Sequence, residues 1–582
     1  MDAPPAPPRP RRAPARSERT AEPAPAPPPG RRWGTGAAAL IVAAFVALPL
    51  RALFKQSGSP MEEGFMLVFP ERVLRGDVPN RDFLHLYGPG SLWVLAAVYR
   101  LAGTALAVER SVGLVQQLAV IGAVFTLALR WGRRFAVICG VVAAMVTITT
   151  VGLAALAWVG GVALALWGLV FALWARQRLA AGGPAAEQAA TRLMLVAGGF
   201  GGAALLYRPD LVLAVVLGYG AAIWGLPRPQ VTRLLAGLVV VAGAGYGVQL
   251  AMAGPGRAIE GMLIDPVFNL RGGRRLPAPP SWGHYDGALQ SVAQLVTPGW
   301  SLPAIAGPKQ VVLWFWLLPA AAIGEVVVGA RRVRADAGSV AARVLLASAL
   351  LGLGMLPQAI QRPDTTHLAW VSAVPIGLLP LFVAEVVRGR GAVRRRTVPT
   401  VVAAITAVVV LFGVMPFFTV RTWTELTRQT FTQDYFGYDV RRGDRLFYLG
   451  SEPITPAAQA LVNDLSRRAR PGQRLFVGTA DLRKTPYSDA YIYYLFPELT
   501  PATRYIEMDP GVANAPGSGL AEEVAGADWL VLSHVWDNWS EPNDARKFGP
   551  DEPNRVVARR FCRVGSYASK GTTYFLLYRR CR

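Results

Sequence analysis

Charged residues are scarce in this chain of 582 residues. They make up 17% of the sequence, whereas hydrophobic residues make up 52%. A soluble protein carries about 25% charged residues. Long apolar runs recur from residue 34 to about residue 420, which excludes an ordinary soluble fold for that region. The composition therefore predicts a polytopic, all-α membrane protein followed by a C-terminal region of different character.

Cysteine is also rare, with three residues in the whole chain. Cys139 lies inside an apolar run, where a thiol packs as a small hydrophobe. Cys562 and Cys581 flank a segment with the pattern of a β-hairpin, and they could form a disulfide if that region lies outside the cytoplasm. Their spacing does not fit a metal site.

Acidic residues are outnumbered by basic ones, 37 to 60, which gives a net charge of +23. Much of the basic excess lies in short connectors between apolar runs, as cytoplasmic loops require. Membrane topology therefore explains the charge, and we expect no nucleic-acid partner. The sequence also has no Walker A lysine motif, dinucleotide-binding glycine motif or HExxH motif, so a soluble nucleotide-sugar or ATP site is unsupported. The frequent Ala, Arg, Gly and Pro resemble the usage of high-GC actinobacteria.

The pattern divides the chain into three parts. Residues 1–32 are rich in Pro, Ala and Arg and are expected to form a disordered, cytoplasmic tail. Residues 33–420 are expected to form the transmembrane domain. Residues 440–582 contain short strand patterns at 474–478, 528–532 and 571–578 and an amphipathic helix at 455–469, which predicts a small α/β domain.

Twelve apolar runs occur between residues 35 and 418, and the basic connectors decide which of them span the membrane. If every run spans, the Arg-rich connectors from 130–134 onward fall on the outer face. If segment 89–108 is instead an interfacial helix, they all fall inside with the N-terminus. We therefore predict eleven spans in the cell membrane, an outer loop at 54–110 and an extracytoplasmic C-terminal domain.

Acidic residues in the outer loop are the first candidates for chemistry. Glu62, Glu63 and Asp82 would lie at one membrane face, where a carboxylate could take a proton from an acceptor hydroxyl. One carboxylate of an adjacent pair could also bind a divalent cation while the other acts on the acceptor, although the loop shows no defined set of metal ligands. The alternative is a solvated acidic loop without catalytic function.

The stretch from Glu62 to Gly103 resembles the first outer loop of GT-C glycosyltransferases. It contains Glu-Glu-Gly-Phe at 62–65, Arg81-Asp82-Phe83 and Tyr87-Gly88-Pro89, followed by an apolar run. It is most similar to the branch that includes protein O-mannosyltransferases and the aminoarabinose transferases of lipid A. The resemblance implies that the acidic pair is catalytic. Glu62 stands where that family usually has Asp, so the base could be Glu62, Glu63 or Asp82.

Two polar breaks between apolar runs also fall on the predicted outer face. They read Arg208-Pro209-Asp210 and Arg362-Pro363-Asp364-Thr365-Thr366-His367. The planar guanidinium of arginine is suited to bind phosphate, so we assign Arg362, His367, Arg208 and Arg81 as candidate ligands of a donor phosphate. The alternative is that each Arg–Asp pair is a structural turn closing a helical hairpin.

The loop at 253–310 contains arginines and aromatic residues, including Arg271, Arg274, Trp282 and Trp300. Such residues could cover a sugar-phosphate site. We favour instead an interfacial aromatic belt in which the arginines reach toward lipid headgroups.

Together these features predict a membrane glycosyltransferase. It would transfer a sugar from a polyprenyl-phosphate donor to an envelope acceptor hydroxyl carried by a glycan, a lipid or a protein. A multi-span transporter or lipid flippase with an outer accessory domain is the competing hypothesis. A catalytically inactive scaffold that presents its outer domain is the third.

Overall fold

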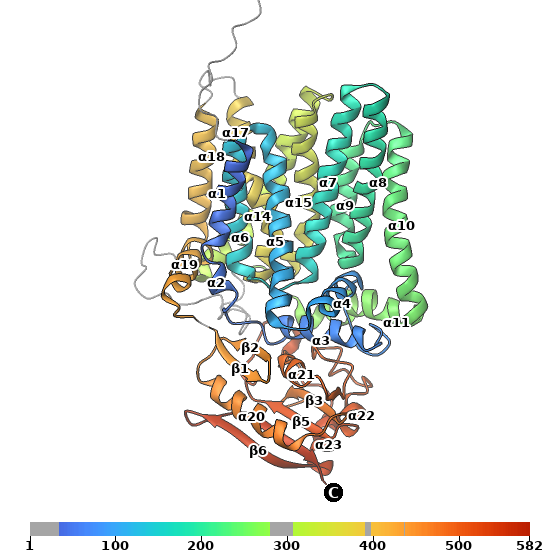
Figure 1. The fold of residues 1–582 in the computed structure, drawn as a ribbon, viewed down its shortest axis with the longest axis vertical. Helices are drawn as coiled ribbons and strands as arrows, with labels where there is room; N and C mark the ends of the chain where they lie inside the picture. Colours follow the sequence, from blue (N-terminus) through green and yellow to red (C-terminus); the bar gives the residue numbers. More distant parts are fainter. Residues whose placement is uncertain (1–33, 280–306, 390–396, 436, 582) are drawn as a thin grey trace, which may run out of the picture.

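A helical bundle and a mixed α/β region stack end to end in the computed structural model of the chain (Figure 1). The structure describes residues 34–279, 307–389, 397–435 and 437–581. The predictions for the tail at 1–32 and for Trp282 and Trp300 concern residues outside these ranges.

Seven helices within the described residues are long and apolar enough to cross a membrane. A helix satisfies its own backbone hydrogen bonds, which is why long apolar runs become helices in a bilayer. The seven are α5 (Leu106–Ala128, extended by a short 3₁₀ turn), α6 (Arg133–Val151), α7 (Ala157–Ala181), α8 (Pro184–Tyr207), α10 (Arg228–Ala253), α14 (Gly307–Ala335) and α15 (Val340–Gln361).

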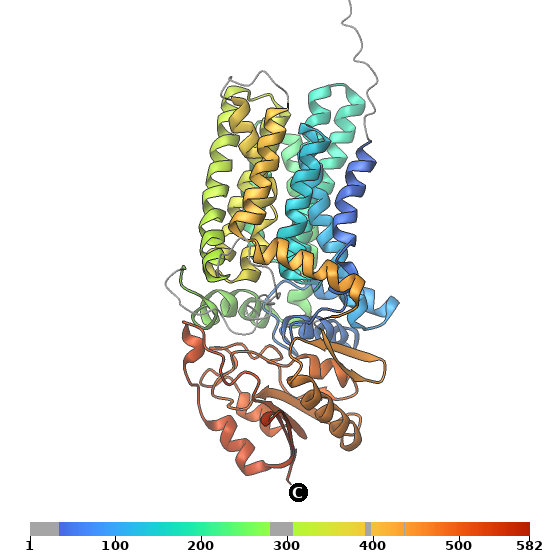
Figure 2. The same ribbon diagram turned by 90° about the vertical axis from the view of Figure 1, so that its left-hand side faces the viewer.

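Two further spans are bent. Helices α16 (Thr365–Ser372) and α17 (Pro375–Gly389) meet at 49°. The helix α18 (Val398–Val408) continues as a π-helix to Val414 and then turns by 90° near Pro416, since proline cannot extend a helix without a break. The continuation through η5 (Phe417–Arg421) and α19 (Thr422–Thr432) runs across the end of the bundle (Figure 2).

The count of eleven spans is not confirmed: the described residues hold seven such helices, or nine with both bent pairs. Two of the predicted spans form helices that are too short to be counted. One is α1 (Thr35–Ala47), which is followed by α2 (Leu50–Leu53), and the other is α9 (Val212–Ile223), which is preceded by η2 (Pro209–Leu211). Both run beside the longer helices in the bundle (Figure 1). A bilayer core of about 30 Å needs about 20 helical residues, and these helices are shorter because turns at Pro49 and near Gly225 end them early.

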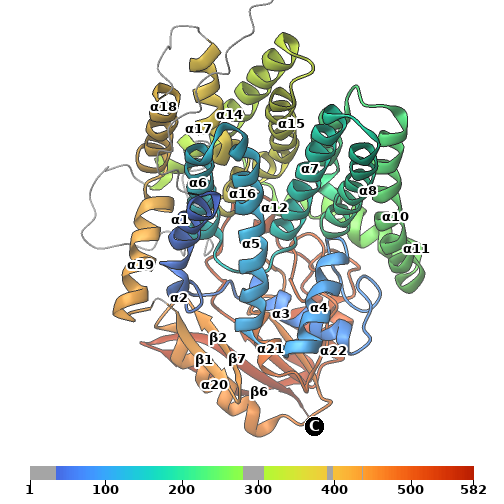
Figure 3. The same ribbon diagram turned by 45° about the horizontal axis from the view of Figure 1, so that its top comes forward.

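The outer loop between α2 and α5 folds into two short helices. They are α3 (Glu62–Leu74) and α4 (Gly90–Ala102). At 13 residues, α4 is too short to cross a bilayer. Both helices lie between the bundle and the C-terminal region, near α11 (Pro255–Ile259), η3 (Glu260–Asn269) and α12 (Arg271–Arg274) (Figures 1 and 3).

The C-terminal region contains a five-stranded mixed sheet with strand order β4-β3-β5-β7-β6. Its strands are β3 (Arg474–Thr479), β4 (Thr500–Pro501), β5 (Trp529–Ser533), β6 (Phe561–Ser569) and β7 (Thr572–Arg580). A separate hairpin joins β1 (Tyr438–Arg442) to β2 (Arg445–Leu449), and the helices are α20 (Ile454–Arg468), α21 (Tyr491–Leu495), α22 (Leu520–Ala525), η6 (Asp544–Arg546) and α23 (Glu552–Arg560). The predicted strands correspond to β3, β5 and β7, and the predicted helix to α20.

Strands β3 and β5 are parallel neighbours, and β7 pairs with β5 in the antiparallel sense. All five residues of β5 are buried, as expected for a central strand covered on both faces. A disulfide joins Cys562 of β6 to Cys581, the residue after β7. The structure thus contains the disulfide that the sequence analysis allowed for a region outside the cytoplasm.

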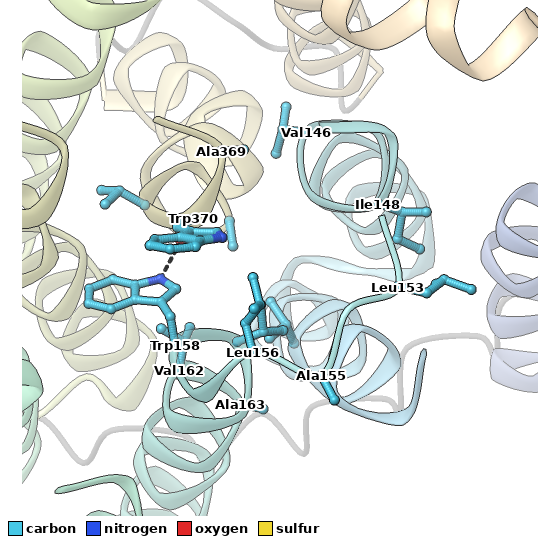
Figure 4. Close-up of a cluster of buried hydrophobic side chains, with 14 of the residues drawn as sticks. Val146, Ile148, Leu153, Ala155, Leu156, Trp158, Val162, Ala163, Ala369 and Trp370 are labelled. Carbon is cyan, nitrogen blue, oxygen red and sulfur yellow. Dashed lines mark hydrogen bonds between the residues drawn. The ribbon is translucent and has the colours of Figure 1, made fainter. Parts of the chain in front are cut away.

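Buried side chains pack α7 against α16 inside the bundle. Trp158 at the start of α7 lies beside Trp370 of α16, and its indole N–H donates to the Trp370 carbonyl at 3.0 Å (Figure 4). The ring centroids are 6.2 Å apart. A buried indole requires such a partner for its N–H, so this contact fixes how α16 packs against α7 beside the cavities described below.

Candidate active site

The two adjacent glutamates of the outer loop have different surroundings. Both lie in the first turn of α3, where successive side chains point about 100° apart. Glu63 is buried and forms a two-point ion pair with Arg110 of α5, at 2.7 and 2.8 Å. Arg110 also donates to the carbonyls of Phe54 and Gln56 at 2.9 Å. Glu63 is therefore committed to anchoring α3 against α5.

Glu62 is half-buried and faces open space instead. Its carboxylate accepts hydrogen bonds from the hydroxyls of Ser59 and Tyr487. Tyr487 comes from the C-terminal region, 425 residues away in sequence, and its own hydroxyl lies 2.6 Å from that of Ser59. Glu62 thus has two donors that hold it in place, and no arginine among the described residues forms an ion pair with it.

Two cavities meet at Glu62. The first, which we call the arginine cavity, has a volume of about 290 Å³ and is lined by Arg208, Arg271, Arg274 and Arg362. The second, the threonine cavity, has a volume of about 140 Å³ and is lined by residues that include Thr149, Thr150, Thr366 and Thr422. Glu62, His367 and Trp370 line both.

Three of the four arginines already have carboxylate partners. Arg208 pairs with Asp210 at 2.6 Å and lies 4.4 Å from the ring centre of Tyr87. Arg274 pairs with Asp509 at 3.1 Å. Arg362 pairs with Asp364 at 2.7 Å and with Glu541 of the C-terminal region at 2.5 and 3.0 Å. These pairs hold the guanidinium groups in fixed positions around the cavity.

Arg271 is different, because it is exposed and no ion pair is formed with it within the described ranges. It lies at the start of α12 and lines the arginine cavity. Arg274, one helical turn later, is largely buried and donates to the carbonyl of Pro486 at 3.0 Å. These two arginines of the 253–310 loop therefore line a cavity instead of forming the interfacial belt that we favoured from sequence.

His367 is held by the helix cap that begins α16. Asp364 accepts from the backbone N–H of His367 and contacts its Nδ1, both at 2.8 Å. The imidazole lies 4.4 Å from the ring of Trp370. The cap orients His367 so that its ring lines both cavities.

Asp82 and Arg81 lie apart from these cavities, since neither lines them. They pair with each other at 2.7 Å, and Asp82 also accepts from the backbone N–H of Val78 at 2.7 Å. The Arg81 hydrogen bond lowers the pKa of Asp82. The pair stabilises the turn before Phe83. The structural alternative, an Arg–Asp ion pair at each polar break, concerned Arg208–Asp210 and Arg362–Asp364, and both of those ion pairs are present.

Two further carboxylates line the arginine cavity. Burial raises the pKa of Glu507, and burial also raises that of Asp509 although Arg274 opposes this shift. Carboxylates with raised pKa values add less negative charge than ionised ones.

Sequence reasoning missed Arg110, Tyr487, Glu541 and Asp509. Each reaches the site by a contact between segments that are far apart in the chain. The charged pair Glu109-Arg110, just before a predicted span, was the one available signal. The described residues include no cluster of three or more His, Cys, Asp or Glu side chains arranged to hold a metal ion, so the acidic loop provides no ready cation site there.

If Glu62 is a catalytic group, replacing Tyr487 by phenylalanine is expected to slow the reaction by about tenfold, because one hydrogen bond to a charged group is lost. The ring contacts with Trp536 and Trp539, at 4.4 and 5.0 Å, would remain. Thermal melting should therefore change little. A Tyr487→Phe protein with an unchanged rate would show that the hydroxyl does not position Glu62.

Asp489 is expected to make the stability of the C-terminal region depend on pH. Burial raises its pKa to about 6, although hydrogen bonds from Ser533 and Trp536 oppose this. A carboxyl that binds its proton more tightly when folded stabilises the fold at low pH, and this contribution is lost as the pH rises from about 4 to about 6. In an Asp489→Asn protein the melting temperature should therefore fall less between about pH 4 and about pH 6 than in the wild type.

Comparisons with known proteins found solved structures with a similar fold but no match by sequence. No protein-family model matches the chain, and no curated protein matches it. ArnT from Cupriavidus metallidurans bound to undecaprenyl phosphate superposes over 94% of this chain and 98% of its own length, with a TM-score of 0.50 and 14% identity. Apo ArnT superposes over the same shares of the two chains, with a TM-score of 0.51 and 15% identity.

A looser similarity is to the apo oligosaccharyltransferase of Archaeoglobus fulgidus. Its TM-score is 0.44 at 13% identity, over 92% of this chain and 74% of that one, which is too low to support an inference. Over nearly its whole length, the chain shares its fold with ArnT.

Proposed function

We propose that this protein is a membrane glycosyltransferase that uses a polyprenyl-phosphate sugar as donor and an envelope hydroxyl as acceptor. The observation that carries the proposal is the meeting of an arginine-lined cavity with a second cavity at the Glu62 carboxylate. A donor phosphate needs cationic ligands, and an acceptor hydroxyl needs a base. The ArnT fold supports this proposal, and one ArnT structure contains undecaprenyl phosphate.

In the proposed reaction the donor phosphate binds in the arginine cavity, and Arg271, Arg274, Arg362 and Arg208 contribute positive charge around it. His367 faces the same space. The acceptor hydroxyl approaches through the threonine cavity to Glu62. Its oxygen forms a bond to the anomeric carbon while the bond from that carbon to the phosphate oxygen breaks. Glu62 takes the proton, and the arginines stabilise the charge on the departing phosphate. Displacement from the opposite side inverts the anomeric configuration.

Within this proposal Glu62 is the base, and Glu63 and Asp82 have structural roles. Glu63 is held by Arg110 at 2.7 Å, and Asp82 lines neither cavity. Glu62 alone among the three lines both cavities.

The proposed location of the site is the outer face of the cell membrane, with a cytoplasmic N-terminus. The disulfide between Cys562 and Cys581 supports an extracytoplasmic C-terminal region, because disulfides persist in oxidising compartments. The basic connectors support the same orientation.

The transporter hypothesis receives less support. Glu325 is a buried carboxylate within α14 with no hydrogen-bond partner in the described part of the chain, and such residues often mark transport pathways. It lines neither of the two cavities described above. A carrier also has no need for a carboxylate held by two hydroxyl donors at a junction of cavities.

Single-turnover transfer by purified protein tests the proposal directly. Radiolabelled polyprenyl-phosphate sugars extracted from the host's own membranes are incubated with the protein and with host acceptor fractions. Label that moves to a new acceptor establishes a transferase. Donor binding without transfer under the same conditions favours the carrier or scaffold hypotheses instead.

Arg271 is expected to bind the donor, because it is the arginine of the cavity without a carboxylate partner among the described residues. Arg271→Gln should raise the KM for the donor by about tenfold, the effect of one charge-assisted hydrogen bond, with a smaller change in kcat. Arg275→Gln is the matched control, since Arg275 is exposed four residues away and lines neither cavity. Equal KM values for the two variants would contradict the assignment.

A further inference from the structure

A third cavity lies at the end of the bundle opposite the C-terminal region. It has a volume of about 310 Å³ and is formed by the adjoining ends of α9, α14 and α15. These ends lie at the top of the bundle, far from the β-sheet (Figure 1). The walls include Trp224, Ala330, Leu346 and Leu350, and the two charged residues among them are Arg334 and Arg343.

Arg343 is the unusual member of this cavity. Its side chain is 6% exposed, and its Nε has no hydrogen-bond partner within the described part of the chain. It also forms no ion pair there. A buried N–H without an acceptor is costly, and an anion bound in the cavity would supply the acceptor that the Nε of Arg343 lacks.

The other walls show what else the ligand contains. Trp224 is 72% exposed although its ring is large and apolar. Its position is fixed by Arg176, which donates to the carbonyls of Ala222 and Trp224 at 3.1 and 2.9 Å. Leu346 and Leu350 continue the apolar wall along α15 toward the middle of the bundle. The cavity therefore combines a buried cation at a helix end with apolar surface that runs into the membrane region.

We propose that this cavity binds an anionic phospholipid, with its phosphate on Arg343 and Arg334 and its glycerol and upper acyl chains against Trp224, Leu346 and Leu350. Arginine binds phosphate through paired N–H donors, and basic pockets at helix ends bind lipid headgroups. The apolar walls favour a lipid over free phosphate, because inorganic phosphate would leave them unfilled. This site is separate from the one that binds the donor, and the inference does not depend on the proposed reaction.

Native mass spectrometry of the purified, delipidated full-length protein tests the site. The protein is titrated with phosphatidylglycerol, and in parallel with phosphatidylcholine and with sodium phosphate. We expect one tightly bound phosphatidylglycerol per chain and much weaker binding of phosphatidylcholine. Arg343→Gln should raise the dissociation constant for phosphatidylglycerol by at least about tenfold. Arg331→Gln is the matched control, because Arg331 is an exposed arginine of α14 outside the cavity.

A second variant keeps the test decisive if Arg343→Gln does not fold. Ala330→Trp fills the cavity without changing any charge, and it should also displace the lipid. Equal lipid binding by the wild type and by both cavity variants would overturn the proposal. So would equal losses in Arg331→Gln and Arg343→Gln, since these would show a diffuse surface charge effect. Binding of phosphate as strongly as of phosphatidylglycerol would overturn the assignment of a lipid.

Discussion

Replacing Glu62 by glutamine is expected to lower the rate of sugar transfer by about 10² to 10⁴-fold, the contribution of a general base. Glutamine keeps the shape of the side chain and can still accept from Ser59 and Tyr487, but it cannot take the acceptor proton. Donor binding and the melting temperature should therefore stay near their wild-type values. Single-turnover kinetics with saturating donor would measure the effect.

Asp82→Asn is the informative comparison for Glu62→Gln. Asp82 belongs to the same outer loop and was an equal candidate from sequence, but it pairs with Arg81 away from both cavities. We expect its replacement to change transfer by no more than a few-fold. A large loss in Asp82→Asn together with wild-type transfer by Glu62→Gln would move the base to Asp82.

Replacing Glu63 by glutamine is expected to destabilise the protein instead of removing a catalytic group. The side chains of Glu63 and Arg110 are each 3% exposed, and breaking a buried ion pair by removing one partner costs about 3–5 kcal/mol. The lost charge would leave the Arg110 guanidinium buried without its carboxylate. Thermal melting in detergent should show a clear decrease for Glu63→Gln and little change for Glu62→Gln.

A double substitution separates the direct interaction between Glu63 and Arg110 from the other contacts of each residue. Arg110→Met removes the cation, and it also removes the hydrogen bonds to the carbonyls of Phe54 and Gln56. Glu63→Leu combined with Arg110→Met should be less destabilised than the sum of the two single changes, because no unpaired charge remains. Strict additivity would contradict a direct interaction between the two side chains.

Several features of the bundle and of the sheet could be predicted from the sequence. Long apolar runs form helices because a bilayer leaves the backbone no other partner, and the buried strands β3 and β5 appear as short apolar segments. The span count was less predictable. An apolar run such as that of α1 shows hydrophobicity along the chain, but a turn at Pro49 shortens its helix to 13 residues.

The sequence by itself determined which residues were candidates: an acidic pair, two Arg-Pro-Asp breaks and a basic, aromatic loop. Only the tertiary structure decided their surroundings, from which we propose their roles. Glu62 and Glu63 are adjacent and chemically equivalent, yet Arg110 of α5 takes Glu63 and Tyr487 of the C-terminal region holds Glu62 beside the cavities. The physical reason is that the neighbours that neutralise, orient or expose a carboxylate come from distant segments. Their positions depend on how the helices and the sheet pack together.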